Sequence, residues 1–130
     1  MHLNKVIFAI DNNTNTHTVA KFMRYLDTVR AMRKMNGTVT HCIGYWEGTL
    51  EPSYMMDQTD FDVHVKDSGF VDGQDCVLHV PGDTRQPCTI VEPNGTQHSV
   101  GPMREVTASE AMKAAAWTYV QATGKYFVTT

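Results

Sequence analysis

The sequence predicts a single α+β domain over residues 1–130, with a small mixed or antiparallel sheet and helices packed on one face. A continuous apolar run at residues 6–10 is typical of a central strand. An amphipathic helix pattern follows it, and turn signals then separate further short strand patterns. The order strand, helix, strand, strand, helix, strand matches the ferredoxin-like split βαβ arrangement.

The first predicted strand leads through a polar loop, residues 11–16, into a long helix. Thr16 is a suitable N-cap, and the helix is expected to run to about Met35 and to be closed by Gly37. One face of this helix is apolar and is made of Val19, Phe22, Met23, Leu26, Val29 and Met32.

A hairpin is predicted next. Residues 38–46 form a strand, Glu47-Gly48 a turn, and residues 50–56 the partner strand. Pro52 cannot donate a ladder hydrogen bond, so it indicates an edge or a bulge. Residues 59–69 are expected to form a short helix that ends at Gly69, with its inward side chains at Phe61, His64 and Val65.

The second half begins with a buried strand at residues 74–80, closed by Pro81-Gly82-Asp83. Two short strands are expected on either side of Asn94-Gly95, which is a hairpin signal. Thr107 and Glu110 have capping-box spacing and should open a final helix through about Thr123, ended by Gly124. A short terminal strand, Tyr126–Thr129, follows.

Composition excludes several classes of protein. The net charge of -3, with a pI near 6.0 and no block of like charges, argues against sequence-independent nucleic-acid binding. No apolar run approaches the about 18 residues of a membrane span, and the N-terminus does not resemble a signal peptide. Three widely spaced cysteines, Cys42, Cys76 and Cys88, fit reduced thiols in a cytoplasm better than a disulfide framework. We therefore expect a cytoplasmic protein.

Familiar catalytic and metal motifs are absent from the sequence. His41-Cys42 and Cys76-x-x-His79 resemble metal ligands, but on regular strands each pair would point to opposite faces, so no metal site is expected. There is no G-x-S-x-G elbow and no P-loop or G-x-G-x-x-G phosphate cradle.

The predicted hairpin at residues 44–54 (GYWEGTLEPSY) brings several polar side chains close together. These are Tyr45, Glu47, Glu51, Ser53 and Tyr54. A three-residue loop would place Tyr45 opposite Glu51. A two-residue loop would place Gly44 there and turn Tyr45 to the other face, and the sequence leaves this register open. A tyrosine hydroxyl beside a carboxylate suits a cationic ligand with polar edges, whereas the alternative is an exposed glutamate with a half-buried tyrosine.

A second candidate segment contains Glu105. It follows Gly101-Pro102-Met103, which is rigid and apolar for a solvent loop. The alternative is that Arg104 and Glu105 form a plain surface pair.

At these residues the chain resembles the bacteriophage S-adenosylmethionine lyases, formerly called hydrolases. The similarity has three parts. The first is a helix rich in Arg and Met followed by Gly37-Thr38-Val39 and the hairpin with Gly44-Tyr45 and Glu51. The second is the strand 74–78 (QDCVL). The third is residues 103–106 (MREV), where the family has a Gln-Glu-Val pattern and this chain has Arg104 in place of the glutamine.

The resemblance implies a trimer with a PII-like, ferredoxin-like core and active sites between subunits. It implies cleavage of S-adenosylmethionine to methylthioadenosine and homoserine lactone without metal or cofactor, which would deplete a host's methyl donor and act against restriction. The implied catalytic residues are Tyr45, Glu51 and Glu105. Further substrate contacts are expected from Trp46, Ser53, Met103 and Arg104.

Other functions stay open at this point. Hydrolysis to homoserine would need a positioned water and a base, for which Glu105 is the first candidate. A non-catalytic trimeric binder of a nucleotide-like metabolite could use the same cleft. An inhibitor that mimics DNA would need a more acidic surface than a net charge of -3 provides.

Overall fold

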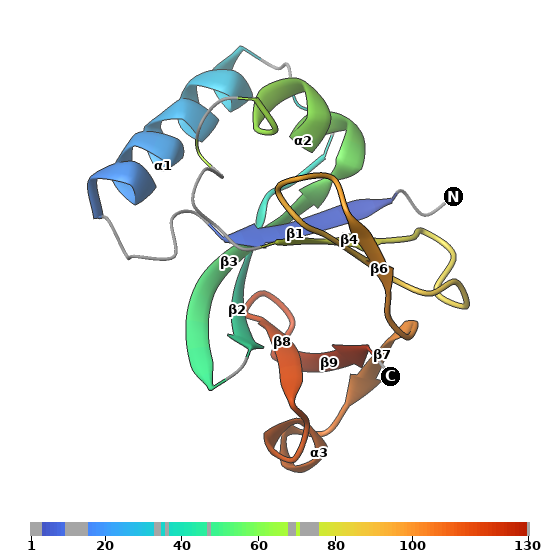
Figure 1. The fold of residues 1–130 in the computed structure, drawn as a ribbon. Helices are drawn as coiled ribbons and strands as arrows, with labels where there is room; N and C mark the ends of the chain where they lie inside the picture. Colours follow the sequence, from blue (N-terminus) through green and yellow to red (C-terminus); the bar gives the residue numbers. More distant parts are fainter. Residues whose placement is uncertain are drawn as a thin grey trace.

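One curled antiparallel sheet organises the protein (Figure 1). The computed structural model describes residues 4–9, 16–32, 35, 37–46, 48–67, 70 and 76–129. Within them, nine strands run in the order β6-β5-β4-β1-β3-β2-β8-β9-β7. The strands are β1 (Lys5–Ala9), β2 (Thr40–Trp46), β3 (Thr49–Asp57), β4 (Val77–Val80), β5 (Thr89–Val91), β6 (Gln97–Ser99), β7 (Met103–Val106), β8 (Ala116–Val120) and β9 (Lys125–Thr129). The helices are α1 (Thr16–Ala31), α2 (Gln58–His64) and α3 (Ala108–Met112).

The predicted α+β class is confirmed, and the centre of the sheet is compatible with a ferredoxin-like fold. Strands β4, β1, β3 and β2 are neighbours in that order, with α1 between β1 and β2 in the chain and α2 between β3 and β4. Strands β5 and β6 extend one edge, and β8, β9 and β7 extend the other. None of the described helices is long and apolar enough to cross a membrane.

The helices cover one face of the sheet, where the main core lies. Phe22 and Leu26 of α1 are fully buried, as their helical spacing predicts. They pack with α2 and with alternate residues of β1 and β3, among them Val6, Phe8, Tyr54, Met56, Phe61 and Val65. Helix α3 packs on the same face farther along the sheet, where Ala111 contacts Val106 and Val128. We call the opposite side, which no described helix covers, the open face.

The predicted hairpin is confirmed as β2–β3, and its register is now settled. Trp46 pairs with Thr49, so two residues separate the strands, and Gly48 has the positive φ of 83° that such short turns favour. Pro52 pairs with Ile43 on β2, but the described pairing of β3 with β1 stops at Ser53. Among the described residues, β1 is not paired with β3 at Pro52. The missing N–H of Pro52 therefore removes no hydrogen bond between these two strands.

Two boundaries in the first half differ from prediction. Helix α1 ends at Ala31, with Met32 already in a turn, so Gly37 does not close it. Gly37 instead donates its N–H to Asp60 Oδ2 at 3.0 Å, which ties the chain after α1 to α2. Helix α2 begins at Gln58 and ends at His64, and His64 is only half-buried rather than inward. Gly69, the predicted loop at residues 11–15 and the start of the predicted strand at 74–75 lie outside the described residues.

The predicted C-terminal helix is wrong over most of its length. The capping box at Thr107 and Glu110 is present, but α3 ends at Met112 and residues 116–120 form β8. The segment AWTYV is aromatic and β-branched, and its strand pairing with β2 outweighs the weak preference of the preceding residues for helix. Gly124, with φ 70°, belongs to the turn between β8 and β9 and ends no helix. Strand β9 confirms the predicted terminal strand.

Candidate functional site

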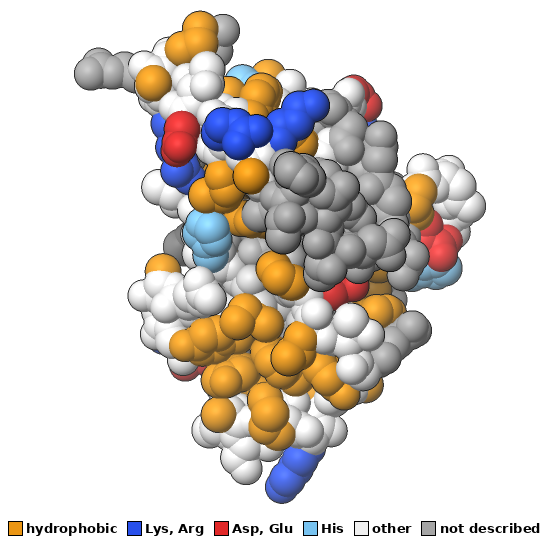
Figure 2. All heavy atoms as spheres, turned by 90° about the vertical axis from the view of Figure 1, so that its left-hand side faces the viewer, with side chains coloured by type: hydrophobic (Ala, Val, Ile, Leu, Met, Phe, Trp, Pro, Cys, Tyr) orange, Lys and Arg blue, Asp and Glu red, His pale blue; other side chains and the backbone are white. Residues whose placement is uncertain are grey.

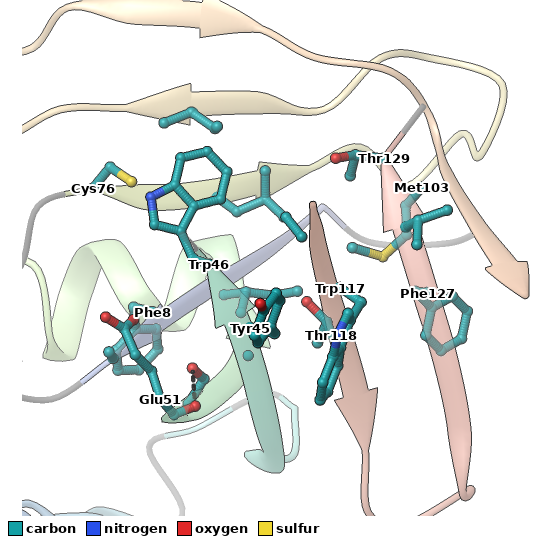
Figure 3. A pocket seen from close by; sticks show the side chains of 18 residues that line it. Phe8, Tyr45, Trp46, Glu51, Cys76, Met103, Trp117, Thr118, Phe127 and Thr129 are labelled. Atoms are coloured by element: carbon teal, nitrogen blue, oxygen red, sulfur yellow. Dashed lines mark hydrogen bonds between the residues drawn. The ribbon is translucent and has the colours of Figure 1, made fainter. Parts of the chain in front are cut away.

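A small pocket opens on the open face of the sheet (Figure 3). Its floor and walls come from β1, β2, β3, β4, β5, β7, β8 and β9, so the curl of the sheet brings together segments far apart in the sequence. The cavity measures about 120 Å³. The open-face side chains that border it are Ile7, Ala9, Trp46, Glu51, Ser53, Leu78, Ile90, Met103, Ala116, Thr118, Phe127 and Thr129.

One row of directly paired residues crosses the floor of this pocket. Glu51 of β3 pairs with Gly44 of β2, Gly44 pairs with Thr118 of β8, and Thr118 pairs with Phe127 of β9. Paired residues present their side chains on the same face. The row therefore places a carboxylate, an open position, a hydroxyl and an aromatic ring side by side.

The predicted residue Ser53 lies directly beside this row. It is buried, with 6% of its surface exposed, and its Oγ donates to the backbone carbonyl of Glu51 at 3.1 Å. This bond holds the β3 backbone at the position that carries the Glu51 side chain. Ser53 therefore helps to fix the backbone that carries Glu51.

Trp46 forms the aromatic wall of the pocket. It lies two residues from Gly44 on the same strand face, and Figure 3 shows it extending toward Cys76. It is 41% exposed, an unusual amount for a tryptophan in a sheet. Apolar side chains of β1, β4 and β5 line the rest of that side, and Met103 of β7 lies at the other side.

Tyr45 does not face Glu51. It pairs with Leu50 and Trp117, so its side chain lies on the helix-covered face. There its ring stacks on Trp117, with centroids 5.5 Å apart and planes at 6°. In Figure 3 the two rings lie together beside β8. Tyr45 borders the pocket but turns its ring away from it, which is the arrangement expected of the two-residue loop.

The second candidate segment contributes Met103 to the pocket but not Glu105. Glu105 pairs with Phe127, so it lies on the open face in the same row as Glu51. Three strands separate the two carboxylates, which amounts to about 19 Å along the sheet. Glu105 is exposed and forms an ion pair with Lys125 at 3.3 Å. Arg104 pairs with Val128 and therefore lies on the opposite face.

Burial shifts the pKa of several side chains in or beside the sheet, and it raises that of Tyr54 on β3. Burial raises the pKa of the Cys42 thiol to about 11, and it also raises the pKa of Cys88. Burial lowers the pKa of His79, although the nearby Asp62 opposes this. His41 and Cys42 face opposite sides of β2, and among the described residues no three potential ligands gather as a metal site would require. Glu47, another member of the predicted hairpin cluster, lies outside the described residues.

The residues from β8 and β9 were missed by the sequence analysis. Ala116, Thr118, Phe127 and Thr129 all border the pocket, but the whole of β8 was predicted to be helical. The alternation of small or polar residues with aromatic ones in AWTYV is the signal that indicates a strand.

The arrangement suits a cationic ligand with an apolar body. Glu51 supplies a negative charge, Trp46 an aromatic face for a cation, and the surrounding strands supply apolar walls. The cavity of about 120 Å³ is smaller than the roughly 300–1,000 Å³ of typical small-molecule pockets. The pocket of one chain is therefore too small to enclose a typical small-molecule ligand.

Comparison with known proteins yields one family. The model of the S-Adenosylmethionine lyase family matches residues 8–130, which is nearly the whole chain and includes every residue of the pocket except Ile7. No curated protein matches the sequence significantly.

Proposed function

Since the chain belongs to the S-adenosylmethionine lyase family and is an S-adenosylmethionine lyase enzyme, we propose that the open-face pocket is where it binds and cleaves this substrate. The products we propose are methylthioadenosine and homoserine lactone. The observation that carries the assignment to this pocket is Glu51, which lies beside an aromatic wall in a largely apolar depression.

The proposed reaction needs no outside nucleophile. The substrate's own carboxylate oxygen attacks its γ-carbon, the bond from that carbon to sulfur breaks, and the electron pair stays on sulfur. The sulfonium becomes a neutral thioether and the carboxylate becomes part of the lactone, so two opposite charges disappear and no proton moves. A pocket with few polar groups favours such a step over water, because it solvates the charged reactant poorly. The protein's main contribution is to hold the methionine tail in attack geometry.

The positions of the residues in and beside the pocket suggest a role for each of them. Glu51 binds the substrate's ammonium group, and Trp46 attracts the sulfonium through its ring face. Ser53 fixes the Glu51 backbone through its 3.1 Å hydrogen bond. We assign Tyr45 a positioning role, because its ring stacks on Trp117 and joins β2 to β8 behind the pocket.

A second copy of the chain would complete the site. Glu105 lies on the open face but outside the pocket that contains Glu51. Glu51 and Glu105 can act on one substrate if Glu105 comes from a neighbouring subunit across the open face. The small size of the pocket supports this arrangement, and we propose a trimer of PII-like type with sites between subunits. The proposal includes no metal or cofactor.

The biological role we propose follows from the reaction. Cleavage of S-adenosylmethionine lowers the supply of methyl donor in the cytoplasm where the enzyme acts. If the chain is encoded by a bacteriophage, this would counter the host's restriction and modification enzymes.

The decisive experiment is incubation with S-adenosylmethionine in water enriched in oxygen-18, with products identified by mass spectrometry. We expect methylthioadenosine and unlabelled homoserine lactone. Label at the γ-hydroxyl of homoserine would indicate hydrolysis, and intact substrate would indicate a binder instead of an enzyme.

The same assay tests the site. Glu51→Gln should lower kcat/KM by about tenfold or more, as loss of a charged hydrogen bond costs about 1.5–3 kcal/mol. Leu50→Ala is the matched control, since Leu50 is the neighbouring residue on β3, 61% exposed on the opposite face. Equal activity of Glu51→Gln and the control would refute the assignment of Glu51.

A further inference from the structure

Gly44 is the one position without a side chain in the row that crosses the pocket floor. It lies between Glu51 and Thr118, paired directly with both. A ligand that extends from Glu51 across the pocket floor toward Thr118 therefore passes over the backbone of Gly44, because the Cβ positions of paired residues are only about 5 Å apart.

The backbone conformation does not require glycine here. The described glycines with positive φ are Gly48, Gly95 and Gly124, and Gly44 lies within the regular pairing of β2. Glycine inside a strand weakens it by roughly 0.5–1 kcal/mol relative to alanine. A glycine within a strand often marks a bulge, a tight bend or a place where another group approaches the backbone closely, and the unbroken pairing of β2 with β3 excludes a bulge at Gly44.

Because of the neighbouring atoms, a larger side chain at position 44 could extend in only one direction. A Cβ atom at this position would lie 3.3 Å from Ser53 Oγ and 3.8 Å from the Glu51 carbonyl oxygen. A methyl group would therefore be tight but tolerable. Anything larger must extend away from the sheet, into the space above the row.

We propose that Gly44 determines the specificity of the site, by leaving room for the substrate's amino-acid tail against the β2 backbone beside Glu51. This inference rests on the proposed function, in particular on Glu51 as the partner of the ammonium group. It predicts that side chains added at position 44 exclude ligands that have this tail more strongly than ligands that lack it.

The test compares Gly44→Ala and Gly44→Val with the wild type. S-adenosylmethionine turnover gives KM and kcat, and calorimetry gives the Kd of methylthioadenosine, the proposed product that lacks the tail. We expect Gly44→Val to raise KM for S-adenosylmethionine at least about tenfold, because the added side chain would occupy the space that the amino-acid tail needs. The Kd of methylthioadenosine should change less than threefold, and Gly44→Ala should give an intermediate KM.

A double variant separates exclusion of the ligand from crowding within the protein. If Gly44→Ala acts only by pressing on Ser53, adding Ser53→Ala should restore the KM seen in Ser53→Ala alone. If the added methyl group excludes the tail, the double variant should keep a higher KM than Ser53→Ala. Comparison of Ser53→Ala with the double variant also tests the inference if Gly44→Val does not fold.

The outcomes distinguish the inference from the function it rests on. Wild-type protein that neither binds nor cleaves S-adenosylmethionine would refute the proposed function and this inference with it. Active wild type with an unchanged KM in folded Gly44→Val would overturn the inference alone. Equal losses for the two ligands would also overturn it, because the added side chain would then not act on the tail.

Discussion

Gly37 and two buried aspartates take part in polar contacts that link the segments framing the core. Asp57 and Asp60 are 3% and 2% exposed, at the junction of β3 and α2. Lys5 of β1 pairs with the Asp57 carboxylate, and the Gly37 N–H donates to Asp60. Buried carboxylates are tolerated only when such partners satisfy them, so these contacts lock the chain between α1 and β2 onto the β3–α2 junction.

We predict that Gly37→Ala destabilises the fold. A Cβ atom at this position would overlap the Asp57 carboxylate, which cannot move without disturbing its ion pair with Lys5. The expected loss is about 2–3 kcal/mol in the free energy of unfolding, measured with urea. Gly124→Ala is the control, and its φ of 70° should cost only about 1 kcal/mol. Equal losses in the two variants would contradict this packing.

At the scale of elements, the β2–β3 hairpin and the β8–β9 hairpin each contain a tryptophan. The two tryptophans lie on opposite faces of the sheet. Trp117 stacks on Tyr45 and meets Tyr126 edge-on with centroids 5.4 Å apart, on the helix-covered face. Trp46 stands on the open face and borders the pocket. Figure 2 shows hydrophobic side chains gathered over the lower part of the molecule, on the side where these hairpins lie in Figure 1.

The two tryptophans should therefore separate stability from binding. Trp117→Ala should lower the free energy of unfolding by about 2–4 kcal/mol, because it removes both ring contacts between β2, β8 and β9. Trp46→Ala should change stability by less than about 1 kcal/mol but raise KM for S-adenosylmethionine severalfold. Urea unfolding and steady-state kinetics on both variants provide the check. A reversed pattern would place the ligand on the other face.

At the scale of the whole molecule, the two candidate carboxylates lie on one face of the sheet, but only Glu51 borders the pocket. Glu51 and Glu105 are separated by β2, β8 and β9. The open face carries both of them, and it is also the face that no described helix covers. A partner subunit that packs across this face would bring its own Glu105 toward Glu51.

Mixing inactive variants tests this arrangement. Glu51→Gln and Glu105→Gln should each be impaired alone. After the two are co-refolded, mixed oligomers would contain some sites with both native glutamates. We expect recovery to about a quarter or more of wild-type activity, with light scattering reporting an oligomer. Monomeric protein with full activity, or no recovery on mixing, would refute a shared site.

Much of the fold was accessible from local patterns. The buried run of β1, the burial of Phe22, Leu26 and Val29 on α1, and the turn signals at Gly48 and Gly95 each depend on near neighbours in the chain and were predicted correctly. Met32, which was predicted on the same apolar face, lies beyond the end of α1 and is 56% exposed. The error over residues 113–123 has a physical cause. That segment has helix-forming residues at its start and strand-forming ones at its end, and pairing with β2 decides between them.

The sequence by itself determined the α+β class, the central strand–helix order, the hairpin that carries Glu51 and, through its residues, the family resemblance. Only the tertiary structure decided that Gly44 rather than Tyr45 lies opposite Glu51, and that β8 and β9 complete the pocket. The reason is that side chains alternate along a strand, so a shift of one residue in register exchanges the two faces of the sheet. Register and strand neighbours depend on contacts between distant segments, and these are formed only when the sheet closes.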